Sequence, residues 1–208
     1  MRTTGAQLIA AAIAFWIGWL LMPGVGITDA AVILDAVGAH RDAVLASSIL
    51  HLICAALFAL AIPGLGRWAE GRGRVLAAAA SLLAIGACAI AADAIFHLAA
   101  YEMTAPGVDR AAMLPVMVQL QTTDLRYLMP FVVALFLGAG ALAGGASRAG
   151  HVSRWNPRLH GIAFAVAIIG GLTLGPRGGG RLVGLAFLAL VSASIAWVGA
   201  ALLRGRAT

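Results

Sequence analysis

The sequence predicts an all-α fold: a polytopic membrane helix bundle with six transmembrane helices and with the N- and C-termini both cytoplasmic. Three observations lead to this fold class. Hydrophobic residues make up 62% of the 208 residues and charged residues only 11%, whereas soluble domains contain about 45–50% apolar and about 25% charged residues. The apolar residues gather in six long runs. The basic residues, all of them arginine, are divided unevenly between the two sides of these runs.

Six runs are long enough to span the bilayer, because a transmembrane helix needs roughly 20 mostly apolar residues. The expected spans are 6–26, 43–65, 75–100, 127–146, 159–175 and 182–203. Turn signals rich in proline and glycine mark the breaks between them, at Pro23-Gly24, Pro63-Gly64, Pro106-Gly107, Gly144-Gly145 and Gly175-Pro176. We therefore expect residues 1–208 to form a single integral membrane domain.

The first run follows a basic residue, Arg2, as the apolar segment of a signal peptide does. Its apolar stretch is long, however, and no small-x-small cleavage pattern follows Leu21. Both features favour an uncleaved anchor. Retaining this helix also gives an even number of spans, which puts both ends of the chain on one side of the membrane.

The arginines orient the bundle. One side carries a single acid, Glu70, and nine arginines: Arg2, Arg67, Arg72, Arg74, Arg148, Arg154, Arg158, Arg204 and Arg206. The other side carries Arg41, Arg110, Arg126, Arg177 and Arg181, together with Asp29, Asp35, Asp42, Glu102, Asp109 and Asp124. Because cytoplasmic loops carry the excess of basic residues, the first side should be cytoplasmic. We expect a multi-pass protein of the bacterial cytoplasmic (inner) membrane whose partner is the lipid bilayer. Its net charge of +6 needs no nucleic acid to explain it.

Two outer loops are longer than a connection requires. Asp29 can cap a short helix over 29–37, and Asp109 can cap another over 109–121. Each segment has an apolar face but is too short to span the bilayer. We therefore expect two interfacial helices that lie flat across the outer mouth of the bundle.

Asp93 is the clearest polar residue at membrane depth, about two turns below the outer end of span 75–100. A charged residue there costs about 2.5–3.5 kcal/mol on insertion scales, so it usually has a role. His97 follows four residues later on the same helical face, and we expect it to hydrogen-bond to Asp93. Tyr101 is the next step along this face, and Glu102 stands near the outer mouth.

Span 43–65 contributes His51. The inner loop that follows this span is short, so His51 should lie on a neighbouring antiparallel helix at the depth of Asp93 and His97. Asp124 and Arg126 stand at the outer start of span 127–146. The sequence therefore predicts a polar pocket, open to the outer side, that is a candidate site for a small-molecule ligand. Its residues are His51, Asp93, His97, Tyr101, Glu102, Asp124 and Arg126.

The pocket residues suit several kinds of chemistry. Two histidines and a carboxylate can bind a divalent metal ion, so His51, Asp93 and His97 are the candidate metal ligands. The same groups can relay protons, and two histidines on neighbouring helices can ligate haem. In the structural alternative, Asp93 only pairs with His97 or Arg126 to satisfy the bundle. No H-E-x-x-H, C-x-x-C or E-x-x-H pattern is present in the sequence to decide among these uses or to indicate an enzyme.

The remaining cysteines, histidines and tryptophans have simpler interpretations. Cys54 and Cys88 lie inside two spans at similar depth and are expected to be small core residues without a disulfide. The histidines at loops or span boundaries, His40, His151 and His160, are expected to be solvated or interfacial. The tryptophans lie mostly near span ends and are expected to anchor the protein at the interface; they are Trp16, Trp19, Trp68, Trp155 and Trp197.

A weak internal similarity relates the run that begins at His51 to the run that begins at His160. A three-helix unit repeated in tandem would be inverted, as in many transporters. A small-solute or proton-coupled transporter with a 3+3 inverted repeat is therefore one alternative function, and a non-catalytic structural or partner-binding membrane subunit is another. A pocket confined to the outer half would favour a ligand or metal site, whereas one that continues towards His160 would favour transport.

The opening layout resembles a family of uncharacterised six-helix bacterial membrane proteins that share a domain of unknown function. In that layout a first span leads to a short outer helix, here Asp29 to Gly38, and then to a basic segment, here His40-Arg41-Asp42. A second span then ends before an inner arginine, here Gly66-Arg67. The resemblance covers about the first third of the chain and the number of helices. It implies the six-helix fold and carries neither an activity nor site residues.

Overall fold

The computed structural model describes residues 1–174 and 179–205, and these residues contain helices and no strand. Six helices in this part of the chain are long and apolar enough to cross a membrane. They are α1 (Arg2–Leu21), α3 (Arg41–Ala69), α4 (Arg74–Met103), the continuous helix Arg110–Arg148, the helix Trp155–Leu174 and α9 (Gly180–Leu203). The chain is therefore an all-α, multi-pass membrane protein, as predicted. Of the predicted loop residues, Gly175-Pro176, Arg177 and Arg206 lie outside the described residues.

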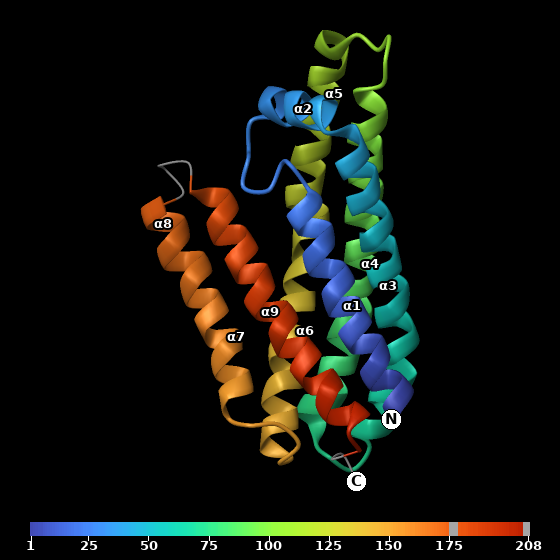
Figure 1. The fold of residues 1–208 in the computed structure, drawn as a ribbon, viewed down its shortest axis with the longest axis vertical. Helices are drawn as coiled ribbons and strands as arrows, with labels where there is room; N and C mark the ends of the chain where they lie inside the picture. Colours follow the sequence, from blue (N-terminus) through green and yellow to red (C-terminus); the bar gives the residue numbers. More distant parts are fainter. Residues whose placement is uncertain (175–178, 206–208) are drawn as a thin grey trace.

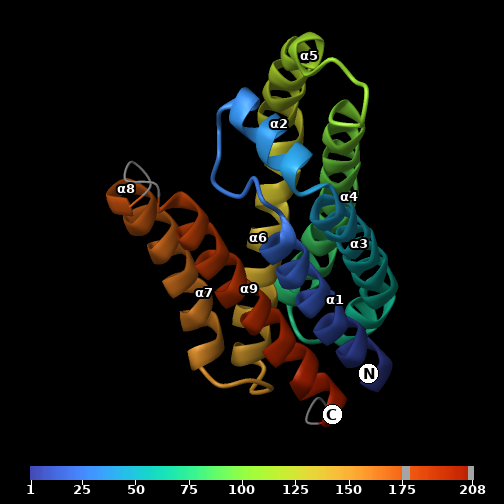
Figure 2. The same ribbon diagram turned by 45° about the horizontal axis from the view of Figure 1, so that its top comes forward.

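The long helices form an elongated bundle (Figure 1). Helix α1 packs between α3 and α9, and α4 packs between α3 and α6 (Met129–Arg148). Helix α7 (Trp155–Ala165) lies at the edge of the bundle, against α9 and α6. Figures 1 and 2 show the short helix α2 (Ala30–Ala39) across one end of the bundle, beside α5 (Arg110–Thr123). We call this the outer end, because the arginine distribution predicts that it faces away from the cytoplasm.

Glycines bring the backbones of neighbouring helices into direct contact, as is common where helices associate in lipid. A Cβ atom on Gly5 in α1 would lie 2.5 Å from the carbonyl oxygen of Gly199 in α9. A Cβ on Gly138 in α6 would lie 2.9 Å from the backbone nitrogen of Leu83 in α4. The contact between α1 and α9 also shows that α1 begins and α9 ends at the same end of the bundle, as an even number of spans requires.

The predicted caps of the two outer helices are confirmed. The Asp29 carboxylate accepts hydrogen bonds from the backbone N–H groups of Ala31 (2.9 Å) and Val32 (3.1 Å) at the start of α2. The Asp109 carboxylate does the same for Ala111 (2.9 Å) at the start of α5. These bonds satisfy N–H groups that have no partner within the first turn of a helix.

The prediction that 109–121 forms a separate flat helix is wrong. Helix α5 continues through a π-helical turn, Asp124–Leu128, directly into α6. Residues 116–129, which run from α5 through this turn, contain neither glycine nor proline. The next proline, Pro130, stands in the first turn of α6. A proline lacks an N–H and crowds the preceding turn of a helix, and the wider π-helical turn accommodates it without breaking the helix.

Several span boundaries also differ from those predicted. Helix α1 ends at Leu21, and residues 22–28 form a loop that includes Pro23. Pro63, by contrast, lies inside α3, which continues to Ala69. The tight connection from α3 to α4 contains Gly71 and Gly73, whose φ angles of +72° and +105° are readily adopted only by glycine.

Candidate metal centre

Three helices bring the central side chains together in the outer half of the bundle. Helix α3 supplies His51, α4 supplies His97, and α1 supplies Trp19. The ring centroid of Trp19 lies 4.9 Å from that of His51 and 5.6 Å from that of His97. The two imidazole rings are themselves 5.9 Å apart. His51 is completely buried by these neighbours.

The predicted metal ligands are adjacent. One donor atom each of His51, Asp93 and His97 lies within 4.8 Å of the other two. The geometric expectation that His51 faces Asp93 and His97 across the contact between α3 and α4 is thus confirmed. The expected hydrogen bond is not formed, because His97 Nδ1 and Asp93 Oδ2 are 3.7 Å apart. At this separation the two groups can attract each other electrostatically but do not share a hydrogen.

The cluster contains buried polar atoms that lack hydrogen-bond partners among the residues that the structure describes. They are both ring nitrogens of His51, Nδ1 of His97 and Nε1 of Trp19. The backbone carbonyl of Phe15 interacts with the His51 ring, but not with normal hydrogen-bond geometry. In the apolar interior of a membrane, polar groups need partners within the protein or a bound group. The unpartnered imidazole nitrogens of this cluster are therefore available to a metal ion or a ligand.

The local packing explains why His51 occupies this position. Ser47, one turn before His51 in α3, donates a hydrogen bond of 2.8 Å to the carbonyl oxygen of Gly18 in α1. This bond holds the two helices in close contact. A Cβ atom on Gly18 would lie only 2.8 Å from His51 Nε2. The imidazole therefore fits against α1 only because residue 18 has no side chain.

A cavity of about 210 Å³ adjoins the cluster and extends towards the outer end. Its polar lining consists of Asp93, His97, Gln121 and Asp124, together with the indole of Trp19. Its apolar walls come from the loop after α1 and from α2, α3, α4 and α5, and include Met22, Ile27, Ile33, Val37, Val44, Phe96, Ala100, Met117 and Leu120. The cavity thus has a polar base and apolar sides.

Asp124 faces the metal-ligand cluster from the opposite wall. It lies in the π-helical turn between α5 and α6, and its carboxylate interacts electrostatically with Asp93 and His97. One turn earlier, the amide of Gln121 donates a hydrogen bond of 3.4 Å to the carbonyl of Thr28, in the loop before α2. The wall that carries Asp124 is thereby tied to the loop that leads into α2.

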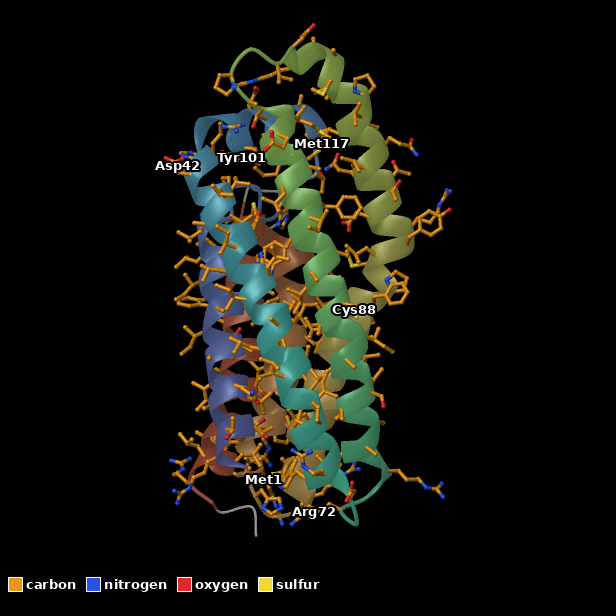
Figure 3. The ribbon with its side chains drawn as sticks, turned by 90° about the vertical axis from the view of Figure 1, so that its right-hand side faces the viewer. Met1, Asp42, Arg72, Cys88, Tyr101 and Met117 are labelled. Carbon is orange, nitrogen blue, oxygen red and sulfur yellow. The ribbon has the colours of Figure 1, made fainter. Side chains whose placement is uncertain are left out.

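Four predicted pocket residues do not line this cavity: His51, which is buried beside Asp93 and His97, and Tyr101, Glu102 and Arg126. Tyr101 stacks beneath Arg41, whose guanidinium carbon lies 3.8 Å from the ring centroid. The same guanidinium donates hydrogen bonds to the Tyr101 carbonyl and to Thr104 Oγ1, which fixes the outer end of α4 to the start of α3. Glu102 and Arg126 are exposed. Figure 3 shows Tyr101 and Met117 towards the same end of the bundle, far from Met1 and Arg72.

The structure adds residues to the site that the sequence alone does not indicate. Trp19, expected to be an interface anchor, packs against both histidines. Trp19 lies four residues after Phe15 and therefore on the same face of the first helix, near its outer end. This position is the sequence signal that could have placed Trp19 beside His51. Met117 and Gln121 are absent from the predicted pocket because a flat helix over their segment would not place them on its wall.

Other expectations for polar and sulfur-containing residues are corrected in the same way. His160 is buried in α7, where Nε2 donates a hydrogen bond of 2.9 Å to the Phe136 carbonyl, so it is neither solvated nor interfacial. Trp68 is buried in the core rather than at the interface. Cys54 is buried but Cys88 is exposed on the surface of α4, so the two cysteines do not meet in the core.

The cavity stops in the outer half of the bundle. On the side of the cluster away from the outer end, the core is filled by apolar side chains that include Cys54, Phe58, Leu83 and Ala87. None of the cavity-lining residues belongs to α7 or to α9. This arrangement favours a binding site over a pathway that continues towards His160.

The donor set fits a divalent transition-metal ion. Zinc binds histidine nitrogen at about 2.0–2.1 Å, so the donor atoms around a tetrahedral ion stand about 3.3 Å apart. The three donors, which lie within 4.8 Å of one another, would have to approach by at most about 1.5 Å to reach that spacing. Haem does not fit, because the Trp19 ring, 4.9 Å and 5.6 Å from the two imidazole centroids, occupies space beside them that a porphyrin would need.

Comparisons with known proteins do not extend this assignment. No protein-family model, curated protein or solved structure matches the chain. The resemblance of the opening layout to a six-helix bacterial family therefore stays a prediction, and function has to be inferred from the geometry of the cluster and its cavity.

Proposed function

We propose that this chain is a metal-binding protein of the bacterial cytoplasmic membrane. It holds one divalent transition-metal ion through His51, Asp93 and His97, and presents that ion to a small cavity on the extracytoplasmic side. The single observation that carries the proposal is the cluster of these three potential ligands around buried, unpartnered imidazole nitrogens.

A purely structural role explains the cluster less well. An Asp–His pair that only stabilised the bundle would be expected to form a direct hydrogen bond, yet its atoms are 3.7 Å apart. It would also leave both nitrogens of His51 without compensation. A bound ion satisfies one nitrogen of each histidine and one oxygen of Asp93. The Phe15 carbonyl beside His51 can then accept the remaining N–H, as backbone carbonyls commonly do for metal-bound histidines.

Two neutral imidazoles and one carboxylate suit zinc, iron(II), cobalt(II) or nickel(II) better than magnesium or calcium, which prefer oxygen ligands. Three protein ligands also leave at least one coordination position open, as in catalytic rather than structural zinc sites. The cavity lies next to two of the three ligands, Asp93 and His97. An open position facing it can be taken by water or by a small ligand.

Cobalt(II) titration of the purified protein in detergent tests the metal centre, because cobalt reports its coordination through visible absorption. We expect one equivalent to bind with the intense bands of four- or five-coordinate cobalt. Asp93→Asn should abolish these bands. His40→Ala removes an exposed histidine and should leave them unchanged. Binding by Asp93→Asn at the strength of the unaltered protein would disprove the assignment.

The orientation has its own test. Single cysteines in place of Asp35 and Gly107 should react with a membrane-impermeant thiol reagent added to intact cells, after Cys88 has been replaced by serine. Cysteines in place of Glu70 and Gly150 should react only after the membrane is opened. Labelling of the Gly150→Cys variant in intact cells would contradict the proposed orientation, whatever the result of the cobalt titration.

A further inference from the structure

Building on the proposed metal centre, we propose that the cavity binds an uncharged amphipathic molecule of about seven non-hydrogen atoms. Its polar head combines an oxygen that binds the metal with an O–H or N–H group that donates to Asp124. Its short alkyl chain lies between α2 and α5. The arrangement of charge, the apolar walls and the cavity volume each support one part of this ligand.

The charges at the base of the cavity indicate an uncharged head group. With neutral histidines, a divalent ion is balanced by the carboxylates of Asp93 and Asp124, which interact electrostatically with each other. The occupied site therefore has no net charge. An anion would meet the Asp124 carboxylate without a surplus of positive charge to offset the repulsion, and a cation would meet the metal.

Asp124 offers a hydrogen-bond acceptor to the ligand. Its carboxylate lines the cavity opposite the metal-ligand cluster and is only partly exposed. An ionised carboxylate can accept hydrogen bonds but cannot donate them. A head group with an acceptor on one side and a donor on the other therefore matches both walls, whereas a carboxylate head matches only the metal.

The walls and volume describe the rest of the ligand. Ile33 and Val37 from α2 face Met117 and Leu120 from α5 across the outer part of the cavity, and none of them offers a polar side-chain atom. The volume of about 210 Å³ exceeds the roughly 150 Å³ of an engineered cavity that binds benzene, so a molecule of about seven non-hydrogen atoms fits. A chain of three or four carbons fits beside the head group, and a long acyl chain would extend beyond the cavity.

Pentanamide, which is uncharged, has seven non-hydrogen atoms and combines a carbonyl oxygen with an N–H donor, is a suitable probe. Added to the cobalt-loaded protein, it should shift the cobalt bands while cobalt stays bound after desalting. Pentanoate, an anion with the same number of non-hydrogen atoms, should bind at least about tenfold more weakly. Dodecanamide should also bind at least about tenfold more weakly, because its chain exceeds the cavity.

Two substitutions test the walls separately from the metal. Met117→Trp fills the cavity and should weaken pentanamide binding at least about tenfold while cobalt still binds. Val118→Trp, on the exposed face of the same helix, is the matched control and should change neither pentanamide binding nor cobalt binding. Asp124→Asn should keep cobalt and reduce the preference for pentanamide over pentanoate.

The outcomes separate the two proposals. Failure to bind cobalt at all would overturn the metal centre and this inference together. Cobalt binding combined with equal affinity for pentanoate and pentanamide, or with no effect of Met117→Trp, would overturn only the inference. Loss of cobalt in Asp124→Asn would also overturn it, because Asp124 would then be a metal ligand and not the acceptor for a bound molecule.

Discussion

Two buried histidines, His51 in α3 and His160 in α7, show how similar packing leads to different chemistry. Each ring lies against a glycine of a neighbouring helix, Gly18 for His51 and Gly140 for His160. Nε2 of His160 donates a hydrogen bond to a backbone carbonyl, so its N–H is satisfied. Neither nitrogen of His51 makes such a bond, and a second histidine and an aspartate lie beside it.

This difference shows that burial alone does not identify a functional histidine. His160 packs with the ring of Phe164, 5.4 Å away, and stabilises the contact between α6 and α7. His51 packs with groups that can share a ligand. His51 differs in having two unpartnered ring nitrogens where His160 has one, and in lying beside Asp93, His97 and the cavity. Changes around His51 should therefore alter metal binding, and changes around His160 should alter stability.

The largest expected difference is in metal binding by His51→Ala and His160→Ala. Loss of His51 should weaken cobalt binding by more than about 100-fold, because changes around the ligands alone cost about 10–100-fold. His160→Ala should bind cobalt as the unaltered protein does. Equal effects in the two variants, measured by cobalt titration, would remove the functional distinction between the histidines.

A smaller effect is expected from Gly18→Ala. The new Cβ would stand 2.8 Å from His51 Nε2 and would displace the ring without removing a donor. We expect cobalt affinity to fall by about 10–100-fold, as it does when the support of a metal ligand is lost. Gly144→Ala is the matched control, since no atom of a neighbouring residue lies within 4 Å of the Cβ that it would add; it should bind cobalt normally.

The stability of the metal-free protein should respond to His160 rather than to exposed histidines. His160→Ala removes a buried hydrogen bond and should lower the free energy of unfolding by about 0.5–1.5 kcal/mol. His40→Ala should stay within about 0.5 kcal/mol. Denaturation in mixed micelles measures both. An unchanged free energy of unfolding in His160→Ala would show that the hydrogen bond from His160 to the Phe136 carbonyl contributes nothing to the stability of the bundle.

The smallest effect concerns the polar pair near His160. Asn156 donates to the Ser194 carbonyl at 3.0 Å and accepts from the Ser194 hydroxyl at 2.8 Å. A double-mutant cycle with Asn156→Ala and Ser194→Ala should give a coupling of about 0.6 kcal/mol and at most about 1.7 kcal/mol, the range for such bonds in membranes. Cobalt binding should be unaffected in all three variants, and a coupling near zero would deny the pair a stabilising role.

The spans and the cluster of His51, Asp93 and His97 can be predicted from the sequence because they depend on local spacing. Hydropathy gives the spans, the i, i+4 relation puts Asp93 and His97 on one face, and the short inner loop brings His51 to the same depth. The caps at Asp29 and Asp109 likewise depend on only the next few residues. Such features follow from helix geometry without knowledge of which helices pack together.

The remaining features depend on packing between helices that are distant in sequence. The contact of Trp19 with both histidines requires the packing of α1 against α3, which hydropathy does not specify. The pairing of Arg41 with Tyr101 joins residues 60 positions apart and removes Tyr101 from the pocket. The continuity of α5 and α6 cannot be predicted from the sequence pattern, because the apolar face of α5 is also typical of an interfacial helix.

The π-helical turn at Asp124–Leu128 makes the cavity tolerant of losing one residue in this segment. Each residue advances an α-helix by about 100°, whereas a residue in a π-helix, whose hydrogen bonds run from i to i+5, advances it by less. Five π-helical residues therefore turn the chain about as far as four α-helical residues, and deleting one residue would let an ordinary α-helix run through the turn with little rotation of α5 relative to α6. Met117 and Leu120 would then keep their place in the cavity wall. A one-residue insertion, by contrast, would rotate α5 and reorganise this wall in a single step.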